Sequence, residues 1–168
     1  MGLQATATHT RDGPSALVGP GPANGLQTRS VRLAALPSAV PWARRVLRHV
    51  LHEWQVESME DSAALLVSEL VTNAVEASAG RTGRDQGRLP MIGLAIRLTA
   101  ASLVLEVWDP SPLRPVPHEA DIAGDRGRGL LLIDALADSW GHRAAEGGKV
   151  VWCEVAIPPA SATTSAAS

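Results

Sequence analysis

The stretch Leu65–Ala77, LLVSELVTNAVEA, decides the fold that this chain is expected to adopt. It contains no Gly or Pro, and its apolar residues recur every three or four positions, which predicts an amphipathic helix with one buried face. Glu69 and Asn73 lie four positions apart, beside that face. A carboxylate there can accept a proton, and an amide oxygen can ligate Mg²⁺. An ordinary surface pair is the plainer interpretation of these two residues.

The segments around this helix predict an α+β fold, with one mixed β-sheet and the helices packed on one face. An earlier helix is expected from its N-cap Ser38 to about Trp54. Ser58 and Asp61 have the spacing of a capping box at the start of the Glu69 helix. The periodicities predict strands at 30–36, 91–98, 103–108, 139–143 and 150–157, and a short helix at 130–137.

The two ends of the chain are expected to lie outside this domain. Residues 1–28 and 159–168 are rich in small and polar residues without periodicity, so we expect disordered tails around a single domain at 29–158. The net charge of −2 gives no electrostatic signal for nucleic acid or an anionic membrane. Cys153 is the only cysteine, and no apolar run approaches the ~20 residues that span a bilayer, so we expect a cytoplasmic protein.

Two further segments carry candidate ligand-binding residues. Asp109 ends a predicted strand and begins a proline-rich loop. A carboxylate shielded from water there can accept a hydrogen bond from an exocyclic amine such as that of adenine, although an Asp that initiates a turn before Pro is the alternative. Gly127, Arg128 and Gly129 open the short helix, where glycines and free N–H groups suit a phosphate. A flexible Gly-rich linker is the alternative for this segment.

Two clusters on the first predicted helix are weaker candidates. His49 and His52 lie three positions apart, but no third metal ligand follows at a metalloprotease spacing, so solvent-facing histidines are the favoured interpretation. Arg44, Arg45 and Arg48 form a small basic patch. We interpret it as a solvated helix face, with a surface for an acidic partner as the alternative.

Three segments together resemble the N, G1 and G2 boxes of the GHKL ATP-binding domains: Ser68–Ala74 (SELVTNA), Asp109 at a strand end, and Gly127–Leu130 (GRGL). The likeness is greatest to the anti-sigma-factor serine/threonine kinases and their stand-alone ATP-binding relatives, and it covers about residues 30–157. The resemblance implies a Bergerat-type two-layer α/β sandwich that binds ATP and Mg²⁺, with a mobile lid at 110–126.

The resemblance also implies a role for each residue of the site. Glu69 would be the general base, Asn73 the ligand of Mg²⁺, and Asp109 the acceptor of the adenine amino group. The residues implied to hold the phosphates are Gly127, Arg128, Gly129 and Leu130.

The implied function is that of an anti-sigma-factor-like kinase, which phosphorylates a small antagonist protein and alternately holds a sigma factor. Direct contact with nucleic acid or membrane is not expected, and a homodimer is one option. A nucleotide-sensing module that sequesters a partner without turnover is the alternative function.

Three positions depart from the family pattern. Asp109 is followed by Pro-Ser-Pro rather than by the glycines of many relatives, which predicts a stiffer loop. Glu76 adds a negative charge three residues after Asn73. Gly148-Lys149 replaces the Gly-Thr of many relatives, so we expect the support that a hydroxyl gives to the Asp109 carboxylate to be missing.

Overall fold

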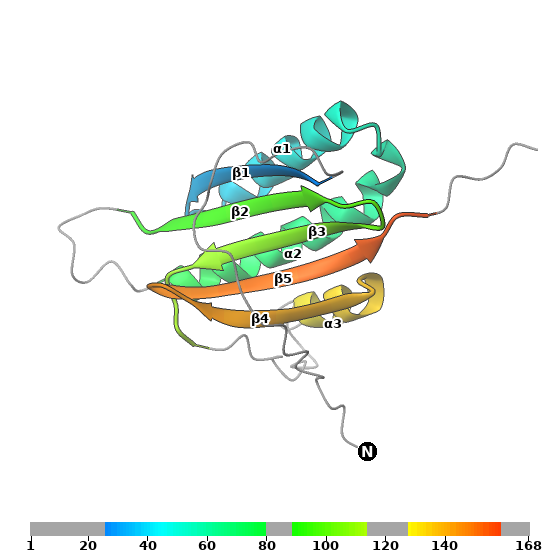
Figure 1. Ribbon diagram of the computed structural model, residues 1–168. Helices are drawn as coiled ribbons and strands as arrows, with labels where there is room; N and C mark the ends of the chain where they lie inside the picture. The colour runs from blue at the N-terminus through cyan, green and yellow to red at the C-terminus, as the bar shows by residue number, and fades with distance from the viewer. Residues whose placement is uncertain (1–25, 80–88, 114–127, 159–168) are drawn as a thin grey trace, which may run out of the picture.

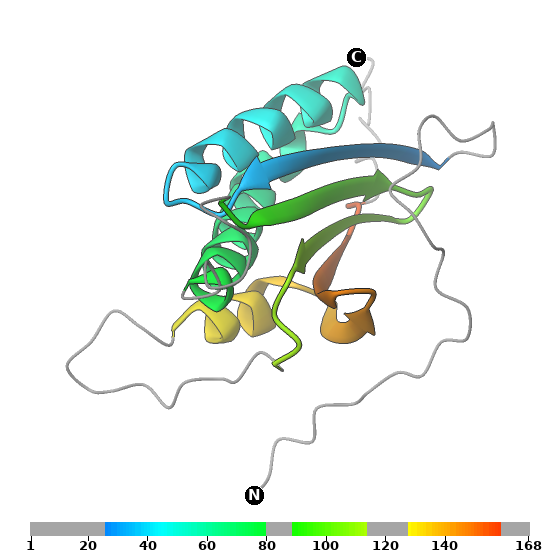
Figure 2. The ribbon, with the colours of Figure 1, turned by 90° about the vertical axis from the view of Figure 1, so that its left-hand side faces the viewer.

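The computed structural model describes residues 26–79, 89–113 and 128–158, which form one five-stranded sheet with helices on one face (Figure 1). Figure 2 shows the two layers edge-on, and the predicted α+β sandwich is confirmed. In chain order the elements are β1 (Gln27–Ala34), α1 (Ala39–Glu53), the 3-10 turn η1 (Glu57–Met59), α2 (Glu60–Ser78), β2 (Met91–Leu98), β3 (Ser102–Asp109), α3 (Arg128–Leu136), β4 (Ser139–Ala145) and β5 (Gly148–Ala156).

Several predictions concern segments outside the described residues. These are residues 1–25 of the predicted tail at 1–28, the predicted tail at 159–168, and most of the expected lid, of which only 110–113 is described. The predicted domain boundary is slightly late, because β1 already includes Gln27 and Thr28. No helix in the described part of the chain combines the length and the apolarity that crossing a membrane requires.

The strand order is β1-β2-β3-β5-β4, and each neighbouring pair of these strands is antiparallel. The sheet is therefore antiparallel throughout the described residues, rather than mixed. Two successive helices separate β1 from β2, so the chain returns in the opposite direction. β3 and β4 do run parallel across α3, but β5 lies between them and pairs with both.

The hydrophobic core fills the space between the sheet and the helices. The inner faces of α1 and α2 are buried as their periodicity predicts, and β2 and β3 turn alternate side chains inward. Burying a Leu or Ile completely stabilises the fold by about 1.5–3 kcal/mol, so this layer holds the helices on the sheet. Its largest fully buried side chains are Leu47, Leu51, Leu66, Leu70, Ile92, Leu94, Ile96, Leu103, Leu105 and Ile133.

The two predicted helix caps are not formed. Ser38 stands at the N-cap of α1 without a side-chain hydrogen bond to the helix. Ser58 belongs to η1 instead of capping α2, whose N-cap is the buried Met59. The start of α2 is thus fixed by the η1 turn and by packing of Met59, while Glu60 and Asp61 in its first turn favour the positive end of the helix dipole.

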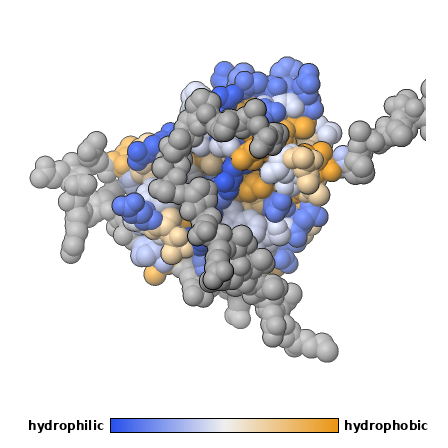
Figure 3. All heavy atoms as spheres, in the orientation of Figure 1, coloured by the Kyte–Doolittle hydropathy of each residue, from blue (hydrophilic) through white to orange (hydrophobic). Residues whose placement is uncertain are grey.

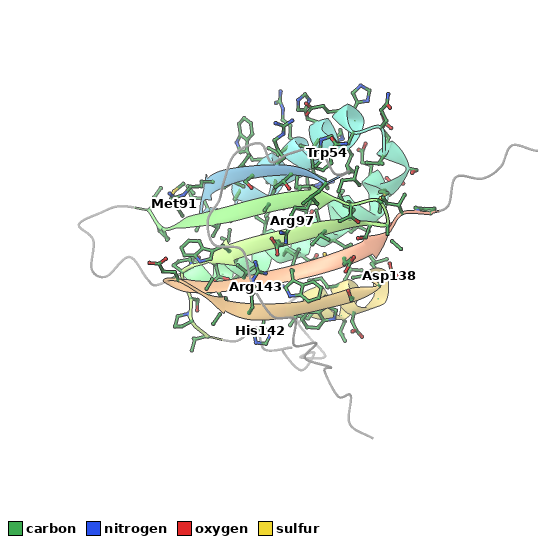
Figure 4. All side chains as sticks on the ribbon, viewed as in Figure 1. Trp54, Met91, Arg97, Asp138, His142 and Arg143 are labelled. Atoms are coloured by element: carbon green, nitrogen blue, oxygen red, sulfur yellow. The ribbon has the colours of Figure 1, made fainter. Side chains whose placement is uncertain are left out.

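Within the described ranges no helix covers the other face of the sheet, and this face carries an ion-pair network. Glu106 accepts from Arg97 at 2.6 Å and from Arg143 at 2.9 Å, so β2, β3 and β4 are joined across the sheet (Figure 4). Figure 3 shows hydrophilic and hydrophobic residues intermingled on this side of the molecule. The Glu106 side chain is 12% exposed and those of Arg97 and Arg143 are 27% and 39% exposed, so water screens these pairs in part and their contribution to stability is modest.

Candidate functional site

Glu69, Asn73 and Gly129 meet where the start of α3 packs on α2. A Cβ placed on Gly129 would lie 2.6 Å from Oε2 of Glu69 and 3.5 Å from Oδ1 of Asn73. Any side chain at position 129 would push the carboxylate away, so glycine is what permits this close approach. The structure therefore brings together two of the three predicted segments of the site.

The side-chain amide of Asn73 has an unsatisfied donor. Its Nδ2 atom is buried and has no hydrogen-bond partner among the described residues. An unsatisfied buried donor costs about 1–3 kcal/mol, a cost that a ligand with an acceptor oxygen would remove. A phosphate oxygen is such an acceptor, and Oδ1 would remain available for a hard cation such as Mg²⁺. The donor and acceptor set at this position therefore fits a nucleotide phosphate with its metal ion.

The Glu69 carboxyl has a perturbed acidity. Partial burial raises the pKa of Glu69 above its ordinary value, and the negative charge of Glu76, one and a half to two turns along α2, raises this pKa further. A carboxyl with a raised pKa is a stronger proton acceptor than an exposed glutamate. Glu76 itself is exposed, so the predicted extra charge near the site is present and acts on Glu69.

The remaining residues of the predicted phosphate loop are only partly described. α3 begins at Arg128, whose side chain lies outside the described residues, as does all of Gly127. The Leu130 side chain is 8% exposed and belongs to the core. Leu130 thus anchors the helix start, and only its backbone remains for a phosphate.

Asp109 forms a buried ion pair with Lys149. The two residues are directly opposite each other on β3 and β5, and Nζ of Lys149 donates to Oδ1 of Asp109 at 2.8 Å. Their side chains are 1% (Asp109) and 6% (Lys149) exposed. The expectation that Asp109 lacks a supporting partner on β5 is therefore wrong, because an ammonium replaces the hydroxyl.

The loop after Asp109 is held by a hydrogen bond from the loop backbone to the Asp109 side chain. The Ser111 N–H donates to Oδ1 of Asp109 at 2.8 Å, which is the turn that an Asp before Pro can initiate. A Cβ on Gly148 would overlap the Asp109 carbonyl and lie 2.9 Å from Cα of Pro110. The close contact of β5 with this bend therefore requires a glycine at position 148.

Asp109 lies on the helix-bearing side of the sheet, because Leu105, Val107 and Asp109 alternate on one face of β3 and are all buried. α2 packs on β3 and β5 on that same side. The two clusters share no hydrogen bond between described residues. The site thus consists of a carboxylate–ammonium pair at the end of the sheet and a Glu–Asn–Gly cluster between α2 and α3.

The pairing of Lys149 with Asp109 is the feature of the candidate site that sequence reasoning missed. Its signal is present in the sequence, because Lys149 is the only lysine in the chain and stands at the start of an apolar strand. Alternation on β5 puts Lys149 on the same face as Val151 and Cys153, which are buried. A lysine on the inner face of a strand needs an acidic partner, and the cross-strand register supplies Asp109.

Other clusters do not form a competing site. Among the described residues no three His, Cys, Asp or Glu side chains gather as metal ligands, and His49 and His52 are exposed. Arg48 pairs with Glu60 at 2.6 Å, and Arg45 stacks over Trp42. An open groove of about 540 Å³ lies between β1 and α1, but it contains none of the predicted site residues.

The comparison with known families agrees with this geometry. A family model described as the histidine kinase-like ATPase domain matches residues 33–154, which include both clusters. A comparison with curated proteins finds no match. The match spans most of the 168-residue chain and leaves out only the larger part of β1 and the last two residues of β5 from the sheet. This chain therefore belongs to the family of histidine kinase-like ATPase domains.

Proposed function

We propose that this ATP-binding domain is a serine/threonine protein kinase of the anti-sigma-factor type, which uses Mg²⁺ and phosphorylates a small antagonist protein. The observation that carries the proposal is the position of Glu69, a carboxylate with a raised pKa, against Gly129 and one turn from Asn73. The proposal is supported because Glu69, a proton acceptor, lies against the start of α3, and free N–H groups at a helix start favour an anion such as phosphate.

Each residue of the site has a distinct task in this proposal. When bound, ATP would supply the phosphoryl group, and Mg²⁺ would supply positive charge that neutralises the phosphates. Asn73 would hold the metal through Oδ1 and would donate from its unsatisfied Nδ2 to a phosphate oxygen. Glu69 accepts the proton of a Ser or Thr hydroxyl on the partner, as that oxygen bonds to the γ-phosphorus and ADP leaves. Asp109 accepts a hydrogen bond from the base through Oδ2, because Oδ1 is already occupied.

A second function has a specific observation in its favour. Glu76 adds a second negative charge about two turns from Glu69 on α2, and the two charges together oppose the approach of further negative charge. A nucleotide-sensing module that binds a partner without phosphoryl transfer would tolerate this charge more easily than a kinase. In that case ATP would control the affinity for a sigma factor or an antagonist, and Glu69 would have no catalytic task.

The two functions are separated by measuring ATP affinity and label transfer together. The parent protein is incubated with γ-labelled ATP, Mg²⁺ and cell lysate, and labelled small proteins are identified. Glu69→Gln should lower transfer by ~10²–10⁴ and leave ATP affinity nearly unchanged, because only the proton acceptor is lost. Asn73→Ala should lower both, because the metal loses a ligand.

Glu60→Gln serves as a matched control, because Glu60 is a glutamate on the same helix that pairs with Arg48 away from the site. It should retain both ATP affinity and transfer. Full transfer by Glu69→Gln would refute the catalytic assignment. Tight ATP binding without any labelled product in the parent would leave the sensing module as the function.

A further inference from the structure

We propose that the groove between β1 and α1 binds an acidic amphipathic helix of a partner protein. β1 forms one edge of the sheet, whereas α3 packs beside β4 at the other edge (Figure 1). None of the described residues that line the groove is proposed to bind nucleotide. The inference therefore goes beyond the proposed function, because a docking site here would serve a kinase and a sensing module alike.

The groove exists because α1 packs mainly on α2 and touches β1 at few points. Its apolar lining consists of Val31 from β1 and of Trp42, Val46 and Val50 from α1. Val31 and Val46 remain partly exposed. The lining residues of α1 extend from Trp42 to Glu53, which is about 16 Å or three helical turns. A partner helix of that length, with an apolar side chain at every third or fourth position, would fit these side chains into the groove of about 540 Å³.

Trp42 is the expected anchor of this surface. Its side chain is 56% exposed, and it is the most exposed of the five tryptophans, all of which lie in the described ranges. The guanidinium of Arg45 lies over its ring, 5.7 Å from the ring centroid. Tryptophan and arginine are among the residues that most often dominate the binding energy of a protein interface. Burial of the Trp42 ring against the partner's apolar side chains should therefore supply much of the affinity.

The charge around the groove selects the kind of partner. Residues 26–54 contain five arginines and one acidic residue, Glu53, whereas the whole chain has a net charge of −2. Arg29 lines the groove and pairs with Glu53 at 2.7 Å. Arg45 also lines the groove, and it forms no ion pair with any residue that the structure describes. A carboxylate beside the apolar stripe of a partner helix would complement this cation.

The same charge disfavours two other occupants. A symmetric dimer through this groove would bring the basic surfaces of two copies face to face, and like charges in an interface oppose association. The ends of the chain, residues 1–25 and 159–168, contain one arginine and one aspartate in total, so neither end supplies an acidic helix. A separate acidic protein is the occupant that the charges favour.

The test uses three fluorescent peptides of about 18 residues, long enough to form a helix. The first has leucines at every third or fourth position with glutamates on both flanks. The second has lysines in place of those glutamates, and the third has the composition of the first with its leucines dispersed around the helix. Fluorescence anisotropy should show that the parent protein binds the first peptide at least about tenfold more tightly than the other two, and that added salt weakens this binding. Equal affinity for the first peptide and either of the others would overturn the proposal.

Variants then locate the binding. Trp42→Ala and Arg45→Glu should each lower the affinity for the first peptide by at least about tenfold. Arg44→Glu is the matched control, because it makes the same charge change at an exposed position of α1 that does not line the groove. It should keep the parental affinity within about threefold. An equal loss in Arg44→Glu and Arg45→Glu would show non-specific attraction and overturn the docking site.

Two further measurements exclude other occupants. A parent dimer that dissociates in Trp42→Ala would assign the groove to a second copy and overturn the proposal. Binding to vesicles that contain phosphatidylserine, lost in Trp42→Ala and without binding of the first peptide, would assign it to a membrane and overturn the proposal as well. ATP affinity should be parental in every variant, which separates this test from that of the nucleotide site. Thermal unfolding checks each variant, and if Trp42→Ala does not fold, the peptide ranking on the parent and on Arg45→Glu decides the question.

Discussion

Replacing Gly129 by alanine should lower the activity of this protein strongly while leaving its stability nearly unchanged. The new Cβ would lie 2.6 Å from Oε2 of Glu69, so the carboxylate must retreat by about 0.8 Å to reach an ordinary 3.4 Å contact. The atom that must move is the end of a flexible side chain, so the fold can yield at little cost. Alanine also favours a helix over glycine by about 1 kcal/mol, which offsets that cost.

The function should nevertheless fall strongly. A displacement of about 1 Å in a catalytic group can reduce the rate by ~10², and we expect a loss of that order in phosphoryl transfer by Gly129→Ala. Its melting temperature should stay level or rise by a few degrees. The assays are thermal unfolding and label transfer from γ-labelled ATP, or nucleotide-dependent partner binding if no transfer occurs.

Gly93→Ala is the control for this experiment. Among the described residues its Cβ would meet Cβ of Trp108 alone, at an ordinary 3.7 Å, so activity should be retained. A Gly129→Ala variant with parental activity would refute the requirement for the close approach of α3 to Glu69. A large fall in its melting temperature would show that the carboxylate cannot yield as the geometry indicates.

Three further predictions follow from the contacts of single residues. Gly148→Ala should lower the melting temperature by many degrees and weaken ATP binding, because the added Cβ would overlap the Asp109 backbone rather than a movable side chain. A variant that melts at the temperature of the parent protein would contradict this prediction. Cys153 is buried, and burial raises the pKa of its thiol to about 12, so iodoacetamide should label it only after denaturation. Rapid labelling of the native protein would contradict this burial. Glu76→Gln should lower the pKa of Glu69 and move the acidic limb of a rate–pH profile to lower pH. Because the pKa of Glu69 is raised in the folded state, protonation of this residue favours the fold, and the stability that it contributes is lost as pH rises from 4.5 through the raised pKa. This loss of stability should be smaller in Glu76→Gln. An unchanged pH dependence of stability would refute the coupling between Glu69 and Glu76.

The elements that periodicity predicts well are those whose burial is one-sided. Leu66 and Leu70 on α2 and Ile92 and Leu94 on β2 are fully buried as their spacing requires. The predicted caps failed because local hydrogen-bonding preference competes with packing. At the start of α2, burial of Met59 and the η1 turn decide where the helix begins.

The site shows the same division between local and long-range information. Glu69 and Asn73 are one turn apart on a single helix, so the sequence suffices to place them together. The approach of Gly129 depends on how α3 packs against α2, and the Asp109–Lys149 pair depends on which strand lies beside β3. Neither packing is encoded in a local pattern, so sequence reasoning could name Asp109 but not its partner.

The position of β5 between β3 and β4 has a consequence for how the protein is made. Of the five strands of the sheet, β5 is synthesised last, although it lies between β3 and β4. Until residues 148–156 leave the ribosome, β3 has an open edge and Asp109 has no cation opposite it. We therefore expect a nascent chain with its first four strands to collapse around α1 and α2, and the Asp109–Lys149 pair to form only when β5 inserts. The sheet and this part of the candidate site should be completed by the same late step.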